Sequence, residues 1–231
     1  MIRVPQEHMS TNQRQRTESP SSEELDIFFQ NFENAYRDAR KERALRTPHL
    51  DVLQIFGLAY AELRHSDVLA WFLDSEAAHE QGPLFLNAVL RRFGHTPIAI
   101  ERYHVDRERH ARVDIACYCR GEFAIFIENK VRHGERDRQV KDMIASLIAV
   151  AREFQISPDD RFAVFLTEEG RDSVTGPTES NPEFDLKNLY PMSRIELFEL
   201  FETALSQQIP RSPLLEGFLQ SYLNSIQKIR S

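Results

Sequence analysis

The segment 112–139, RVDIACYCRGEFAIFIENKVRHGERDRQ, decides how this chain folds. Its first part alternates apolar and other side chains, as a strand with one buried face does. The residues expected on that face are Val113, Ile115, Cys117 and Cys119. The part that follows, FAIFI at 123–127, is apolar at every position, which is typical of a central strand covered on both faces. The segment therefore predicts a β-hairpin with one strand in the middle of a sheet.

Charged residues accompany this hairpin at the end of the apolar strand. Glu128 and Lys130 are two positions apart, so the pleat of a strand points them to the same side, roughly 6–7 Å apart. Asp114 is expected on the preceding strand, facing away from Val113. A three-residue loop places Asp114 opposite Glu128, whereas a two-residue loop pairs it with Ile127 and sends the two carboxylates to opposite faces. The hairpin register therefore decides whether these charges share one site.

Two interpretations of the charged residues remain open at this point. Opposed carboxylates repel one another unless a cation lies between them, and hard oxygen ligands suit Mg²⁺. The alternative is a structural ion pair of Glu128 with Lys130, because a charge at the end of a buried strand must be paired or bind something.

The remaining elements are expected to enclose the hairpin in one domain. We expect a disordered leader at 1–20 and a single domain at 21–231, with its core at about 50–170 and C-terminal helices at 193–229. The pattern predicts helices at about 21–36, 59–74, 84–93 and 135–154. It predicts strands at 98–105, 161–167 and near 189–190, and a long loop at 168–186. This order gives a small mixed sheet between helices.

Composition restricts the class of protein more than the function. The chain has 231 residues, 41% hydrophobic and 28% charged, which is an ordinary globular balance. It has no apolar run of membrane-spanning length and no signal-peptide core, and its two cysteines form a C-x-C pair, so we expect a cytoplasmic protein. The net charge of −7 permits nucleic-acid binding but does not argue for it.

The segment 112–139 and the string ELRHSDVLAWFLD at 62–74 together resemble the PD-(D/E)XK nuclease superfamily. They are similar to its bacterial branch, in which a Glu-x-x-His-Ser helix precedes the Asp…Glu-x-Lys hairpin. The resemblance covers roughly residues 50–170. It implies an α/β fold with a restriction-endonuclease-like core, a small mixed β-sheet flanked by α-helices. The proline that often precedes the Asp is absent, since Val113 stands there.

The resemblance also implies a role for each hairpin residue. Asp114 and Glu128 would bind the metal together with the backbone carbonyl of Asn129. Lys130 would orient or activate the attacking water. The usual ion is Mg²⁺, with Mn²⁺ as an alternative. The implied activity is hydrolysis of DNA phosphodiester bonds, in restriction, repair or phage defence. A homodimer is possible, and no membrane partner is expected.

Two supporting groups are candidates on neighbouring helices. The resemblance favours Glu62 as an auxiliary metal or water ligand. The alternative is a helix junction, with Ser66 as an N-cap and His65 bonded to a backbone carbonyl. Gln139 resembles a glutamine that positions the site in many of these nucleases, and its alternative is a helix-terminal hydrogen bond.

Two other functions compete with the nuclease. One is a catalytically silent nucleic-acid-binding or assembly module on the same fold, which the acidic balance favours. The other is an ordinary α/β domain with a structural ion pair. Arginines near the site could grip flanking phosphates, and the candidates are Arg132, Arg136 and Arg138.

Overall fold

The computed structural model describes residues 26–27, 29–33, 52–55, 57, 60–99, 103–110, 113–130, 136–208 and 212–230. The leader expected at 1–20 lies outside the described residues. In chain order the elements are α2 (Val52–Ile55), α3 (Glu62–Leu73), α4 (Leu84–Arg92), β1 (His104–Arg107), β2 (Ile115–Cys119), β3 (Phe123–Asn129), α5 (Gln139–Glu153), η3 (Pro158–Asp160), β4 (Arg161–Thr167), η4 (Leu186–Asn188), β5 (Leu189–Ser193), α6 (Arg194–Ser206) and α7 (Pro213–Arg230). No helix within the described ranges is both long enough and apolar enough to cross a membrane.

The five strands form one mixed sheet in the order β1-β2-β3-β4-β5. β1, β2 and β3 pair antiparallel, whereas β3, β4 and β5 pair parallel. β3 lies in the middle and every residue in it is buried, which confirms the central strand that FAIFI predicts. The expected mixed sheet flanked by helices is therefore present.

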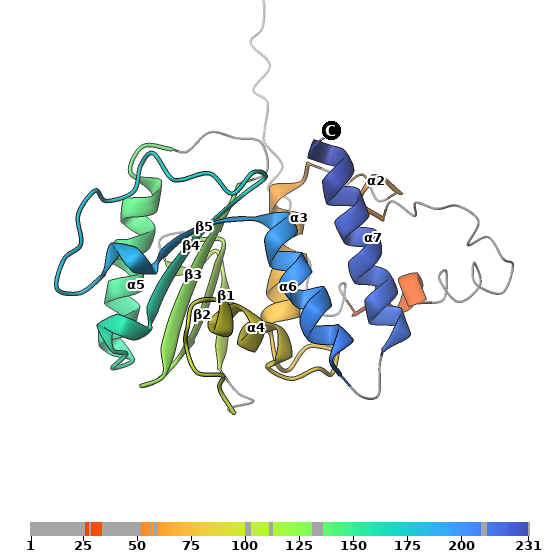
Figure 1. The fold of residues 1–231 in the computed structure, drawn as a ribbon, viewed down its shortest axis with the longest axis horizontal. Coiled ribbons are helices and arrows are strands. Elements are labelled where there is room, and N and C mark those ends of the chain that lie inside the picture. The colour runs from red at the N-terminus through yellow and green to blue at the C-terminus, as the bar shows by residue number, and fades with distance from the viewer. Residues whose placement is uncertain are drawn as a thin grey trace, which may run out of the picture.

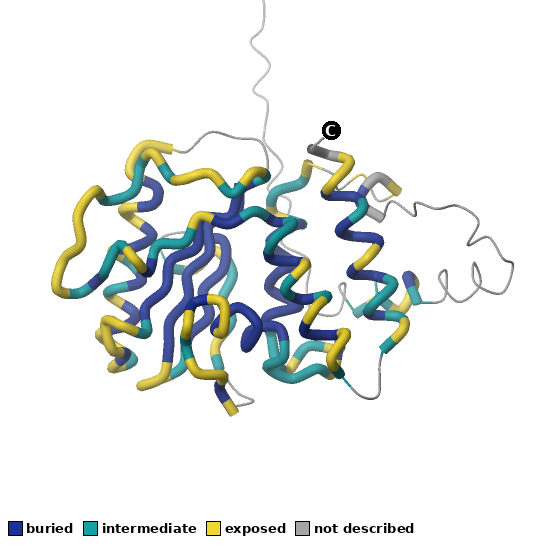
Figure 2. Tube along the Cα trace, in the orientation of Figure 1, coloured by how far each residue is buried: buried dark blue, intermediate teal, exposed yellow. Residues whose placement is uncertain are grey.

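Helices cover both faces of the sheet (Figure 1). α5 covers one face, and α3, α4, α6 and α7 lie on the other. A hydrophobic core lies on each face of the sheet, and alternate residues of β3 belong to one or the other. Ile125 and Ile127 pack with α3 and α6, while Ala124 and Phe126 pack with α5. Figure 2 shows the central strands buried along their length. This two-sided burial explains why β3 has no polar alternation.

The β2–β3 hairpin has the three-residue loop. Cys119 pairs with Phe123, which leaves Arg120, Gly121 and Glu122 as the connection. Gly121 has a φ of 73°, in the left-handed region that three-residue hairpin loops require and that glycine adopts without steric cost. Its N–H donates to the carbonyl of Phe154 at 2.9 Å, which ties the loop to the end of α5.

Three boundaries differ from the sequence prediction. β1 begins at His104 rather than 98, because the backbone N–H and carbonyl of Ile98 bond the side chain of Asn87 on α4 at 2.8 and 2.9 Å instead of a strand. α5 begins at Gln139 rather than 135, since Arg138 has a left-handed φ of 61° that a helix cannot contain. α3 is one helix starting at Glu62. The helices expected near 193–205 and 213–229 are present as α6 and α7.

Candidate functional site

The hairpin register brings Asp114 and Glu128 to the same end of the sheet. Ile115 pairs with Ile127, so Asp114 and Glu128 are the next residues of the two segments beyond that pair, and the charge of Glu128 acts on Asp114. The carboxylate of Asp114 also accepts the backbone N–H of Asn129 at 2.7 Å. Val113 was expected on the face of Ile115, but it packs with the α5 core because it precedes the strand, where the alternation does not hold.

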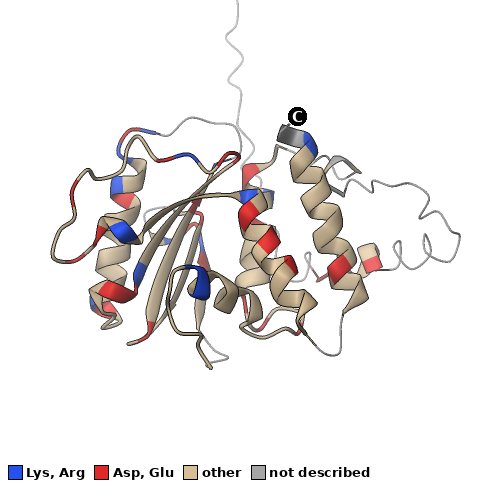
Figure 3. Ribbon diagram, in the orientation of Figure 1, with Lys and Arg blue, Asp and Glu red and all other residues tan. Residues whose placement is uncertain are grey.

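Lys130 lies between two carboxylates from different elements. Its Nζ is 3.0 Å from Oε1 of Glu128 and 3.1 Å from Oε1 of Glu62. Glu128 and Lys130 are 3% and 8% exposed, so these charges are held away from bulk water. Figure 3 shows the strands mostly free of charged side chains, with charges gathered on helices and loops. The charged end of β3 is an exception to that distribution.

Gln139 connects the first turn of α5 to Glu128. Its Oε1 accepts the backbone N–H of Arg136 at 3.1 Å, and its Nε2 donates to Oε1 of Glu128. These two bonds fix which side of the amide faces the carboxylate. The helix-terminal hydrogen bond and the contact with the site were alternatives in the sequence, and the structure contains both.

The acidic groups change one another's proton affinity. Burial raises the pKa of Asp114 to about 7, and the nearby carboxylate of Glu128 adds to the rise. Burial also raises the pKa of Glu128, against the opposing effect of Lys130. Burial acts to lower the pKa of Lys130, but Glu128 and Glu62 outweigh it and the pKa rises. Carboxylates with this raised proton affinity would be stabilised by a bound cation.

The donor set can accommodate a divalent ion with hard oxygen ligands. Among the described residues, Oδ1 of Asp114 and Oε2 of Glu128 make no hydrogen bond or ion pair, so each residue offers one oxygen. No group of three or more His, Cys, Asp or Glu side chains in the described part of the chain is arranged to hold a metal. Oε1 of Glu62, which the resemblance implies as an auxiliary ligand, accepts a hydrogen bond from Lys130 Nζ at 3.1 Å.

Backbone geometry directs the carbonyl of Asn129 toward Asp114. The N–H of Lys130 donates to the carbonyl of Leu166 on β4 at 2.7 Å. In a trans peptide the N–H and the carbonyl point in opposite directions, so the carbonyl of Asn129 points away from β4, to the side where Asp114 lies. A third oxygen ligand is therefore available from the main chain.

α3 supplies a row of polar side chains next to the hairpin. Ser66 Oγ donates to the carbonyl of Glu62 at 3.1 Å and accepts from the side-chain amide of Asn129 at 2.9 Å. Ser66 is inside the helix, so the N-cap interpretation is wrong. His65 Nδ1 lies 2.5 Å from the hydroxyl of Tyr222 on α7. His65 is therefore part of the contact between α3 and α7.

Two arginines at the site were not identified from the sequence as parts of it. Nε of Arg107 donates to the carbonyl of Asp114 at 2.8 Å, and its guanidinium also pairs with the buried Asp67 of α3. Arg194 donates to the carbonyl of Lys130 at 3.0 Å. No sequence signal singles out Arg194, because it comes 64 positions after the residue it contacts.

Comparison with known protein families agrees with this geometry. The family model of the PD-(D/E)XK nuclease superfamily matches residues 50–224, more than half of the chain. The match includes the α3 row, the hairpin, α5 and Arg194. The chain belongs to the PD-(D/E)XK nuclease superfamily. No curated protein and no solved structure gives a significant match.

Membership in the PD-(D/E)XK superfamily agrees with the fold. The five-stranded mixed sheet between helices is a restriction-endonuclease-like core, as the resemblance implied. The superfamily consists typically of nucleases, which generally use divalent metals. Trp71, on α3, is a core residue: it is 8% exposed and stacks on Phe29.

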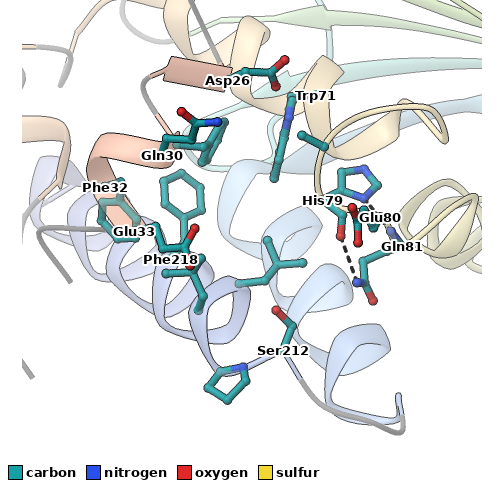
Figure 4. Close-up of a pocket in the computed structure, with 15 residues that line it drawn as sticks. Asp26, Gln30, Phe32, Glu33, Trp71, His79, Glu80, Gln81, Ser212 and Phe218 are labelled. Carbon is teal, nitrogen blue, oxygen red and sulfur yellow. Dashed lines mark hydrogen bonds between the residues drawn. The ribbon is translucent and has the colours of Figure 1, made fainter. Parts of the chain in front are cut away.

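A large cavity in the described part of the chain lies away from these PD-(D/E)XK motif residues. A cavity of about 710 Å³ is bounded by Phe29, Trp71, His79 and Phe218, from α3, the loop after it, α7 and the helical residues near the N-terminus (Figure 4). A smaller one of about 170 Å³ lies at Glu128. We place the candidate site beside the smaller cavity, because Glu128 and its hydrogen-bond partner Gln139 line it.

Proposed function

We propose that this chain is a metal-dependent nuclease that hydrolyses DNA phosphodiester bonds. The observation that carries the proposal is the hairpin register, which brings Asp114 and Glu128 to one end of the sheet, where Lys130 pairs with Glu128. Family membership supports nuclease chemistry in general. DNA as substrate and Mg²⁺, or Mn²⁺, as the ion are the finer parts of the proposal.

The proposed metal ligands are Asp114, Glu128 and the backbone carbonyl of Asn129. When bound, the ion would supply Lewis-acid polarisation of the phosphate and a lower pKa for a bound water. Gln139 holds the Glu128 carboxylate in place through its amide N–H. Asn129 fixes Asp114 through its backbone N–H.

Lys130 is the proposed group that acts on the nucleophile. Its ammonium orients the attacking water and stabilises negative charge that develops on the phosphate. Glu62 keeps the ammonium protonated and in position, and takes part in binding the water or the ion. The exposed Arg136 and Arg138 would grip flanking phosphates. Arg132, proposed for the same role, lies outside the described residues.

Cleavage of defined DNA substrates tests the proposal. Purified protein is incubated with single-stranded, linear and supercoiled DNA in Mg²⁺ or Mn²⁺, with a chelator control. We expect metal-dependent cleavage that the chelator abolishes and that Asp114→Ala and Lys130→Ala each abolish. Activity that survives both substitutions would place the reaction elsewhere. Tight metal-independent DNA binding without cleavage would favour the silent binding module instead.

A further inference from the structure

Arg194 is the arginine most completely withdrawn from solvent among the described residues, at 1% exposure. It is the first residue of α6, directly after β5. One guanidinium nitrogen, Nη1, donates to the carbonyl of Lys130 at 3.0 Å. Within the described part of the chain, Nε and Nη2 have no hydrogen-bond partner. A fully buried guanidinium with only one of its three nitrogens hydrogen-bonded carries a large desolvation free energy that its protein contacts do not offset.

A second buried arginine shows what a structural role looks like in this fold. Arg161, at the start of β4, is 6% exposed and donates from all three guanidinium nitrogens to the carbonyls of Ile156 and Glu183. Arg194 lacks such saturation. Filling space or satisfying one carbonyl would not require a cation, so the charge of Arg194 and its contact with Lys130 need another explanation.

With the contact to Arg194, both backbone polar groups of Lys130 are hydrogen-bonded. The N–H of Lys130 is bound to the carbonyl of Leu166, and its carbonyl is bound to Arg194. These two peptide groups flank the Lys130 Cα, so together they fix its φ and ψ. The direction of the side chain follows from the backbone, and it brings the ammonium between Glu62 and Glu128.

The charge of Arg194 also suits its surroundings. Burial lowers its pKa, while Tyr222, Glu168 and Glu62 act in the opposite direction. Three carboxylates, those of Glu62, Asp114 and Glu128, face one ammonium at the site. A second positive charge behind the lysine backbone offsets part of that excess without occupying the place of a metal or substrate.

We propose that Arg194 is a positioning residue of the nuclease centre, which holds the Lys130 backbone through its guanidinium so that the ammonium meets the nucleophile. The inference rests on the proposed function, and it concerns a residue outside the Asp…Glu-x-Lys motif. Arg194 acts through Lys130 and has no contact with substrate in this assignment.

The test compares Arg194→Gln, Arg194→Lys and Arg194→Ala with wild type, with Arg161→Gln as the matched buried control. Cleavage of plasmid DNA in Mn²⁺ gives kcat and KM, calorimetry gives the Mn²⁺ dissociation constant, and thermal melting reports folding. We expect Arg194→Gln to lower kcat about 10–100-fold, with KM and Mn²⁺ affinity within about threefold of wild type. Arg194→Lys should retain part of the activity, and added methylguanidinium should raise the kcat of Arg194→Ala.

The outcomes separate the positioning role from a structural one. Arg161→Gln should lower the melting temperature without a selective loss of kcat. If Arg194→Gln keeps wild-type kcat, or if its loss of kcat follows melting temperature as in Arg161→Gln and methylguanidinium restores nothing, the positioning role is wrong while the nuclease stands. A wild-type chain that neither binds Mn²⁺ nor cleaves DNA overturns the proposed function itself.

Discussion

At the scale of single residues, the candidate site depends on which oxygen of each carboxylate is already bonded. Glu128 uses one oxygen for both Lys130 and Gln139, which leaves the other for a cation. Asp114 divides its oxygens similarly, with one taken by the N–H of Asn129. Contacts within the chain therefore orient one oxygen of each carboxylate.

Removing the ammonium of Lys130 separates metal binding from catalysis. In Lys130→Gln we expect kcat to fall about 10²–10³-fold, because the group that stabilises developing negative charge is lost. Mn²⁺ should bind at least as tightly, since Glu128 loses a competing cation. Cleavage rates and calorimetry measure the two effects. Lys187→Gln, a change at an exposed lysine, is the control and should alter neither quantity. Loss of Mn²⁺ binding in Lys130→Gln would contradict this division of roles.

Gln139→Ala tests the support of Glu128. The variant removes the amide that donates to Glu128 and accepts from Arg136. We expect Mn²⁺ affinity to fall about tenfold, as for other groups that orient a metal ligand. Calorimetry provides the measurement, and Gln220→Ala, at an exposed position of α7, provides the comparison. Equal affinities in the two variants would show that Glu128 needs no such support.

At the scale of elements, the hairpin loop sets the register on which the site depends. Gly121 has a φ of 73°, and a Cβ added there meets no atom within 4 Å. The cost of Gly121→Ala is therefore backbone strain alone, which we expect to lower the free energy of unfolding by about 1 kcal/mol. Gly121→Asn should cost less, because asparagine tolerates the left-handed region. Urea unfolding gives both values, and an alanine variant as stable as wild type would mean that the loop adopts another conformation.

Element boundaries could be predicted where a local pattern determines them and not where a contact with another element, or an unusual backbone angle, determines them. β4 has the predicted bounds, because its continuous apolar run reflects burial on both faces. β1 was misplaced because a side chain of α4 bonds Ile98, and that contact is invisible in a local pattern. The start of α5 was misplaced for a related reason, the left-handed Arg138.

At the scale of the whole molecule, the burial of His79 beside the 710 Å³ cavity makes the stability of the fold sensitive to pH. The ring is buried among Trp71, Phe72 and Phe85. It lies near Trp71 and Gln81 in Figure 4, and its Nδ1 accepts the backbone N–H of Gln81 at 3.0 Å. Burial lowers the pKa of His79 from 6.5 to about 4. The unfolded chain therefore binds this proton more readily than the folded one, so stability is lost as pH falls from the unfolded pKa toward 4.

The size of this effect can be measured by difference. Between pH 7 and pH 5 we expect wild type to lose about 2 kcal/mol more unfolding free energy than His79→Asn, which cannot titrate but keeps an acceptor for Gln81. Urea unfolding in EDTA at the two pH values cancels the titration of other groups. Parallel losses in the two proteins would show that His79 is protonated in the folded state.

The central strand, the candidate residues at its end and the family resemblance can all be recognised in the amino-acid sequence. Those features are local, since an apolar run and a short spacing of charges are written in neighbouring positions. Three other features depend on the folded chain. They are the register that brings Asp114 and Glu128 together, the contact of Lys130 with Glu62, and the positions of Arg107 and Arg194 beside the hairpin. Loop conformation fixes the first, and packing between elements far apart in the chain fixes the others, so no local pattern could contain them.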